Sequence, residues 1–100
     1  MTAIVYEITA KVQPDLCQSY EDYMQNRHIP DLLATRCFGS ASFERSEDGR
    51  YQIRYYAETR QRLEEYLRSH APRLRSDFQK HFPVGVELSR EEWSLIRHFP

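Results

Sequence analysis

Apolar and polar residues alternate over the first dozen positions of the chain, as they do in a strand that buries one face. The apolar face takes every second residue, namely Ile4, Tyr6, Ile8, Ala10 and Val12. The same alternation returns over residues 50–58 and predicts another strand. Two further strands are expected at about residues 37–45 and 86–96. The last is long for so small a domain, and we expect its end to extend past the sheet toward a partner.

Between these strands, two segments carry apolar residues at helical spacing. The first begins at Pro14, which suits the first position of a helix, and runs to about His28. Because Pro30 cannot continue the hydrogen-bond ladder, residues 30–35 are expected to form a kinked extension. In that extension Ile29, Leu32 and Leu33 still point inward.

The second helical segment is expected to begin after Thr59, whose side chain can cap it. The step Ala71-Pro72 should break this helix before a second helical piece, which ends at Pro83 and Gly85. The inner stripe of both pieces together comprises Leu63, Tyr66, Leu67, His70, Leu74, Phe78 and Phe82.

The order strand, helix, strand, strand, helix, strand predicts an α+β fold of the ferredoxin-like βαββαβ type. Asp48-Gly49 favours a hairpin between the second and third strands. We expect a single domain over residues 1–100, with a four-stranded antiparallel sheet and two kinked helices on one face. The other face of the sheet is then left uncovered.

That uncovered face is unusually polar, with Glu7, Thr9, Ser40, Ser42, Arg54, Tyr56, Glu87 and Ser89. It can stand in water, bind a strand of RNA, or close against a second copy of the chain as a barrel. Residues 50–56 lack the glycine that an RNA-binding strand of this fold needs, so RNA ranks last. We expect a homodimer whose interface includes Arg54, Tyr56, Arg90 and Trp93, with Trp93 as its anchor.

Charge and composition exclude several classes of protein. Fifteen acidic against 14 basic residues give a net charge of -1, without the positive bias of nucleic-acid binding proteins. No apolar run approaches the roughly 20 residues of a spanning helix, and no signal peptide is recognisable, so we expect a cytoplasmic protein without membrane contact. Cys17 and Cys37 lack CxxC spacing and are expected to be free thiols. Only three glycines are present, so no phosphate loop is readable, and we expect neither a metal nor a cofactor.

Several stretches together resemble the DUF4286 family of uncharacterised bacterial proteins. They are residues 66–75, then Phe82 and Ser89-Arg90, residues 4–9, and the segment 27–38. Where many relatives have a glycine before the phenylalanine of strand two, this chain has Cys37. The family is similar to the dimeric α+β barrel superfamily, in which two ferredoxin-like subunits pack sheet against sheet. That superfamily includes cofactor-independent monooxygenases, haem-degrading enzymes, muconolactone isomerases and small stress-responsive proteins.

Two histidines are candidate site residues. His28 ends the first helix, where an imidazolium is favoured, and it is either a helix-terminal cap or a general acid or base over a cleft. His70 lies on an apolar helical stripe and either bonds a backbone carbonyl or, as the resemblance to haem-degrading enzymes implies, ligates haem iron.

A charged set on the uncovered face is the other candidate. Period two places Glu7, Arg54, Tyr56 and Glu58 on the same side of neighbouring strands. In an enzyme, Arg54 stabilises a developing enolate or carboxylate while Glu7 or a tyrosine moves a proton. In the alternative, Arg54 and Glu7 neutralise each other in the dimer and fix its register.

Two functions follow from these candidates. The first is binding of a small apolar or aromatic molecule, without chemistry, in a cavity between sheet and helices. The residues expected to contact that ligand are Tyr6, Glu7, Phe43, Tyr51, Tyr55 and His70. The alternative is a cofactor-independent monooxygenase or isomerase with His28, Arg54 and Tyr56 as catalytic residues.

Overall fold

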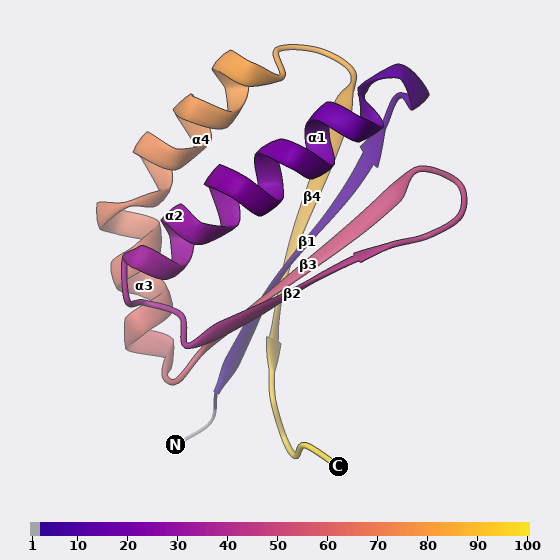
Figure 1. Cartoon of the computed structure of the whole chain (residues 1–100). Coiled ribbons are helices and arrows are strands. Elements are labelled where there is room, and N and C mark those ends of the chain that lie inside the picture. Colours follow the sequence, from indigo (N-terminus) through magenta and orange to yellow (C-terminus); the bar gives the residue numbers. More distant parts are fainter. Residues whose placement is uncertain (1–2) are drawn as a thin grey trace.

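Four antiparallel strands form one sheet in the order β2-β3-β1-β4 (Figure 1). The strands are β1 (Ile4–Val12), β2 (Ser40–Arg45), β3 (Arg50–Ala57) and β4 (Val86–Ser94). This computed structural model describes residues 3–100. The strand order and the element order are those of the ferredoxin-like fold, which confirms the predicted architecture.

All helices cover the same face of the sheet (Figure 1). The first helical segment comprises η1 (Pro14–Leu16), α1 (Cys17–Tyr23), η2 (Met24–His28) and α2 (Ile29–Ala34). The second comprises α3 (Arg60–Ser69) and α4 (Ala71–His81), which meet at His70 as the Ala71-Pro72 step predicts. Thr59 caps α3, since its hydroxyl accepts a hydrogen bond of 3.2 Å from the amide of Arg62.

The irregularity in the first helical segment precedes Pro30 instead of following it. Residues Met24–His28 form a π turn, in which the amide of Ile29 donates to the carbonyl of Met24, five residues back. A turn of this kind accommodates the missing N–H of Pro30 without ending the helix, so α2 continues directly. Leu32 is then fully buried, whereas Ile29 and Leu33 are half-buried.

Two strand ends differ from the prediction. β2 begins at Ser40, because Arg36 has a left-handed backbone (φ 64°) that turns the chain out of α2 and leaves Cys37 and Phe38 buried ahead of the strand. β4 ends at Ser94, level with the start of β1, because Ile4 is the last partner in the register. Residues beyond the strand extend away from the sheet (Figure 1), and Ile96 is 96% exposed.

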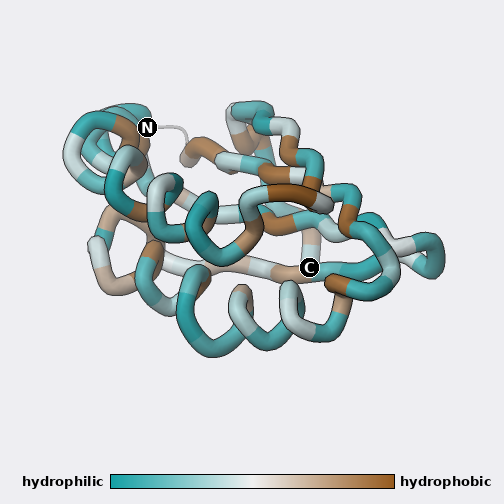
Figure 2. The backbone as a smooth tube through the Cα atoms, turned by 90° about the horizontal axis from the view of Figure 1, so that it is seen from above, coloured by the Kyte–Doolittle hydropathy of each residue, from teal (hydrophilic) through white to brown (hydrophobic). Residues whose placement is uncertain are grey.

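The core lies between the sheet and the helices and is rich in aromatic rings. The inner side chains of β1 and β3 pack on Leu32, Leu63, Leu74 and the rings of Tyr20, Tyr66 and Phe78. Figure 2 shows hydrophobic residues interspersed with hydrophilic ones along the helices, as expected for amphipathic helices on a sheet. The opposite face of the sheet carries no helix, as the sequence predicts.

Candidate functional site

A cavity of about 100 Å³ lies between the covered face of the sheet and the helices. Its apolar lining comes from the sheet and from both helical segments: Ile8, Met24, Phe78 and Leu88, with the rings of Tyr6, Tyr20, Tyr55 and Tyr66. Its polar lining adds His28, Arg75, Gln79 and Arg90. The core is therefore not closely packed at this point, and the space is bordered by both rings and ionisable groups.

Three buried polar atoms of the lining have no hydrogen-bond partner among residues 3–100. They are the hydroxyls of Tyr20 and Tyr55 and the Nδ1 atom of His28. A buried polar group without a partner costs about 1–3 kcal/mol, so three around one cavity are unusual in a native fold. The cavity is therefore bordered by polar groups whose hydrogen-bonding capacity is unused.

Tyr20 and Tyr55 approach the cavity from opposite layers. Tyr20 is fully buried in α1, and its ring packs against Tyr51 (centroid distance 4.9 Å) and Phe82 (5.9 Å). Tyr55 is fully buried at the middle of the sheet in β3, packed against Phe38 (5.3 Å). Burial raises the pKa of both phenols well above the ordinary value, so both remain neutral hydroxyls that can donate or accept.

His28 reaches the cavity from the π turn. Its ring lies 5.8 Å from that of Tyr23 and 5.5 Å from that of Phe78. Burial lowers the pKa of His28 to about 4, although the carboxylates of Asp31 and Asp77 act in the opposite direction. The imidazole is therefore neutral at pH 7. Because the helix continues into α2, His28 is not a helix-terminal cap, and the dipole argument for an imidazolium does not apply.

Two arginines stand where the cavity meets a larger outer hollow of about 530 Å³. Tyr6, Arg75 and Arg90 line both spaces. Arg75 donates a hydrogen bond of 3.0 Å to the hydroxyl of Tyr6. Within residues 3–100, neither arginine forms an ion pair. The entrance to the cavity thus carries two arginines without an ion partner in the described part of the chain, and Glu91 and Glu92 also line the outer hollow.

Arg90, which the sequence prediction assigns to the dimer interface, lies on the covered face, because the register pairs it with Ile8. The physical reason is the period of two, since Arg90 follows Val86 and Leu88 at alternate positions and shares their side.

The uncovered face holds the predicted ion pair. Arg54 of β3 donates from Nε to the Glu7 carboxylate at 2.9 Å across to β1, and Glu7 is only 8% exposed. Tyr56 and Trp93 both pair with Val5 in the register and so share this face. Glu58 follows the end of β3 and is exposed, so it lies outside the strand network.

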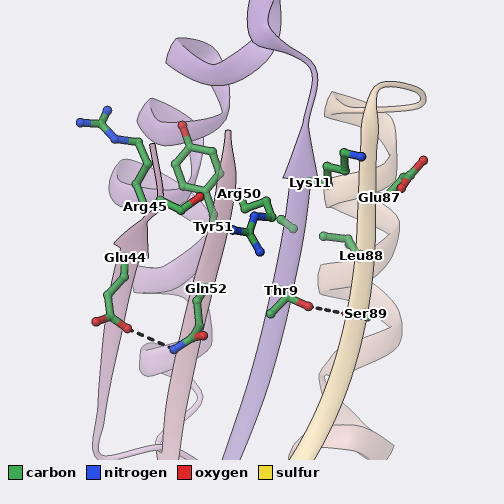
Figure 3. A pocket seen from close by; sticks show the side chains of 12 residues that line it. Thr9, Lys11, Glu44, Arg45, Arg50, Tyr51, Gln52, Glu87, Leu88 and Ser89 are labelled. Atoms are coloured by element: carbon green, nitrogen blue, oxygen red, sulfur yellow. Dashed lines mark hydrogen bonds between the residues drawn. The ribbon is translucent and has the colours of Figure 1, made fainter. Parts of the chain in front are cut away.

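A shallow hollow of about 600 Å³ lies beside this ion pair, toward the end of the sheet that holds Lys11, Arg50 and Glu87. Figure 3 shows side chains from all four strands around it, including Lys11, Gln52 and Glu87. The Gln52 amide donates to Glu44 at 3.3 Å, and the hydroxyls of Thr9 and Ser89 are in contact. Most groups of this hollow are charged or hydrogen-bonded among themselves, in contrast to the three unpartnered atoms of the cavity.

The structure does not bring the three predicted catalytic residues together within one chain. His28 lies on the covered side of the sheet, whereas Arg54 and Tyr56 lie on the uncovered side. A sheet separates the two groups, so His28 cannot share a substrate with Arg54 in the same subunit.

The predicted ligand-binding residues divide similarly. Tyr6 and Tyr55 line the cavity, whereas Glu7 is on the opposite face. Phe43 and Tyr51 pack on Tyr20 farther along the covered face, and the Tyr51 hydroxyl donates to Glu21 at 2.6 Å. His70 stacks on Tyr66 (6.5 Å), and its Nδ1 lies 3.2 Å from Arg73, outside the cavity lining.

Sequence reasoning missed Tyr20 and Arg75 as site residues. Tyr20 lies on the apolar stripe of the first helix, although a tyrosine in a core brings a hydroxyl that needs a partner. Arg75 is one of two arginines of α4, both exposed, and its charge alone does not distinguish it from Arg73. The spacing of Tyr20, Met24, His28 and Leu32 at every fourth residue was the available signal.

Among residues 3–100, no cluster of three histidine, cysteine or carboxylate side chains is arranged to hold a metal ion. Over the same residues, no helix has the length and apolar character needed to cross a membrane.

Solved structures with this fold include several bacterial enzymes. A variant of SnoaB from Streptomyces nogalater, described as a cofactor-independent oxygenase, has a TM-score of 0.78 at 9% identity over 98% of this chain and 97% of its own. The ActVA-Orf6 monooxygenase of Streptomyces coelicolor, solved with nanaomycin D, has a TM-score of 0.74 at 14% identity over 99% and 92%.

A dimeric ferredoxin-like protein from an uncultured marine organism is similar as well, with a TM-score of 0.70 at 13% identity over 99% of this chain and 100% of its own. At such low identity these likenesses show the fold alone, which is ferredoxin-like. No curated protein matches the chain. The family model described as a domain of unknown function, DUF4286, matches residues 3–95, and the chain therefore belongs to that family.

Proposed function

We propose that this protein binds a small aromatic molecule bearing an oxygen or nitrogen substituent in the cavity between sheet and helices. The observation that carries the proposal is the set of three buried polar atoms without partners around one space. A ligand that offers a donor or acceptor to Tyr20, Tyr55 or His28 removes the cost of leaving that group unpaired. The surrounding rings favour a flat, apolar body.

The size of the cavity limits the ligand. At about 100 Å³ it is smaller than the usual ligand pockets of about 300–1,000 Å³. The ligand is therefore a single ring, or the end of a longer molecule that extends through the outer hollow past Arg75 and Arg90. Ordered water is the competing occupant, since about three molecules at about 30 Å³ each fill the same volume.

Phenol is a suitable first probe because it combines one ring with one hydroxyl. In a titration followed by ¹H–¹⁵N NMR, we expect shifts at the amides of the cavity-lining residues. Tyr55→Phe removes one unpartnered hydroxyl and should weaken phenol binding by about three- to tenfold. The matched control is Tyr56→Phe, the next residue of the strand on the opposite face, which should leave the affinity unchanged. No shift at any lining residue would mean that water is the only occupant.

A second candidate function uses the same cavity for proton transfer. Cofactor-independent oxygenases and isomerases that act on carbon acids begin by removing a proton, which needs an unprotonated base beside the acidic carbon. His28 lines the cavity and is unprotonated at pH 7, because its pKa is lowered to about 4; that pKa makes it a weak base, and the arginines at the entrance would stabilise the anion that forms. The test is deuterium exchange at the methyl group of acetophenone, a single-ring carbon acid, in D₂O. Acceleration by the protein that His28→Gln abolishes supports catalysis, whereas an unchanged exchange rate leaves only binding.

We also propose that the uncovered face of the sheet closes against a second copy of the chain. Trp93 is 48% exposed on the same face as the Glu7–Arg54 pair, in which Glu7 is buried and Arg54 is half-buried. The fold neighbour described as a dimeric ferredoxin-like protein supports this assembly.

Two free cysteines, Cys17 and Cys37, are consistent with a reducing compartment, and we propose the cytoplasm.

A further inference from the structure

We propose that the ligand of the cavity is an anion, an aromatic carboxylate, whose charged group lies between Arg75 and Arg90 while its ring enters the cavity. This inference rests on the proposed binding function and adds the chemical class of the ligand. The two arginines come from different layers, Arg75 from α4 and Arg90 from the edge strand β4, and both border the inner cavity and the outer hollow.

Both guanidinium groups remain available to a ligand. Among the described residues, the one hydrogen bond of Arg75 goes to the neutral hydroxyl of Tyr6, and Arg90 has none. By contrast, Arg27 pairs with Asp77 and Arg60 with Glu92. A guanidinium presents several N–H groups in a fixed plane that matches a carboxylate, so two without acidic partners at one entrance form an anion site.

The acidic groups around the entrance do not cancel this charge. Glu91 and Glu92 line the outer hollow. Glu92 is held by Arg60, and within residues 3–100 neither glutamate forms an ion pair with Arg75 or Arg90. Deeper in, Asp31 and Asp77 face His28, but Asp77 is already bonded by Tyr23 (2.8 Å) and Arg27 (2.9 Å).

The interior completes the match to an aromatic acid. Behind the arginines, the rings of Tyr6, Tyr55 and Tyr66 line the space, and His28 is neutral. A carboxylate placed deep among these groups would be desolvated without a counter-charge, whereas at the entrance it meets two cations. The arrangement therefore sets the orientation of the ligand, with its ring inside and its charge outside.

Benzoate and benzamide test the charge directly, because they share shape and size but differ in charge at pH 7. We expect isothermal titration or NMR to give a dissociation constant at least about tenfold lower for benzoate than for benzamide. Raising the salt concentration should weaken benzoate binding and leave benzamide binding unchanged.

Variants separate the arginines from general surface charge. Arg90→Gln and Arg75→Gln should each weaken benzoate binding by about tenfold while benzamide affinity stays within about twofold. Arg68→Gln on α3 is the matched control, because it removes an exposed arginine outside both spaces and should change neither affinity.

The outcomes distinguish the two proposals. If benzamide binds as tightly as benzoate, or if Arg90→Gln leaves benzoate binding unchanged, the anion proposal is wrong while aromatic binding stands. If phenol, benzoate and benzamide all leave the cavity residues undisturbed, the binding function itself fails and the anion proposal with it.

Discussion

Trp93→Glu is expected to convert a dimer of this protein into a monomer. Two chains of 12.0 kDa give 24.0 kDa, and light scattering on a size-exclusion column should report that mass for the unchanged protein. Trp93 is a large ring 48% exposed on the uncovered face, directly opposite Val5. Buried interface tryptophans contribute about 2–4 kcal/mol, so the dissociation constant should rise by about 30- to 1,000-fold.

The matched control for this variant is Val84→Glu. Val84 is 76% exposed in the turn before β4, so the same charge is introduced at an exposed apolar position outside the sheet face. It should leave the mass at twice that of one chain. A mass of 12.0 kDa for the unchanged protein, or a Trp93→Glu variant that remains dimeric at micromolar concentration, would show that this face is not the interface.

The second large effect is a loss of stability in mild acid that depends on His28. In the folded chain the pKa of His28 is lowered to about 4 from an ordinary value of 6.5, because burial disfavours the charged imidazole. The unfolded chain therefore binds a proton on His28 at a higher pH than the folded chain does. The stabilising effect is complete above about pH 6.5 and is lost as the pH falls toward 4.

The size of this loss follows from the two pKa values of His28. Lowering the pKa from 6.5 in the unfolded chain to about 4 in the folded chain corresponds to about 3 kcal/mol in the free energy of unfolding between pH 7 and pH 4. Carboxyl groups whose pKa is lowered by partners, such as Glu21 and Asp77, add their own loss below about pH 4.5. Urea unfolding of the protein and of His28→Gln at several pH values isolates the histidine, because the carboxyl contribution is common to both.

His28→Gln should therefore show a weaker dependence on pH than the unchanged protein, with the difference concentrated between pH 6.5 and 4. His98→Gln is the matched control, since His98 is exposed beyond the end of β4 and should reproduce the behaviour of the unchanged protein. Identical pH profiles for the protein and for His28→Gln would mean that His28 is not held neutral in the fold.

The sequence was sufficient for the architecture because its signals are local. Alternation located all four strands to within a few residues, Thr59 marked the start of α3, and Pro72 marked the break between α3 and α4. Alternation also assigns each strand residue to one of the two faces of the sheet. Arg90, two residues after Leu88, shares the covered face by the same rule.

The π turn explains why the site was harder to predict than the fold. Four residues advance an α-helix by about 400°, so each step of four drifts by about 40° around the axis. Tyr20, Met24, His28 and Leu32 would then spread over about 120°, yet all four are buried on one side. The wider turn at Met24–His28 removes that drift and brings His28 to the cavity.

The cavity itself has no sequence signature, since it depends on how side chains from distant segments pack. Tyr55 and Tyr6 were recognised because they lie on the apolar faces of strands, whereas Arg75 enters the site only through the docking of α4 on the sheet. The sequence alone does not show which of the two arginines of α4 borders the cavity. The position of Arg75 and Arg90 at the same entrance is apparent only from the three-dimensional structure.

The unpartnered hydroxyls of Tyr20 and Tyr55 also link ligand binding to folding. A compound that pairs with them binds the folded chain and not the unfolded one, so it raises the free energy of unfolding by RT ln(1 + [L]/Kd), or about 2.7 kcal/mol at a hundredfold excess over Kd. The melting temperature of the protein then rises as more of the cavity is occupied by the compound. A library of small aromatic acids screened by thermal melting alone would rank its members by affinity, with no assay for a reaction.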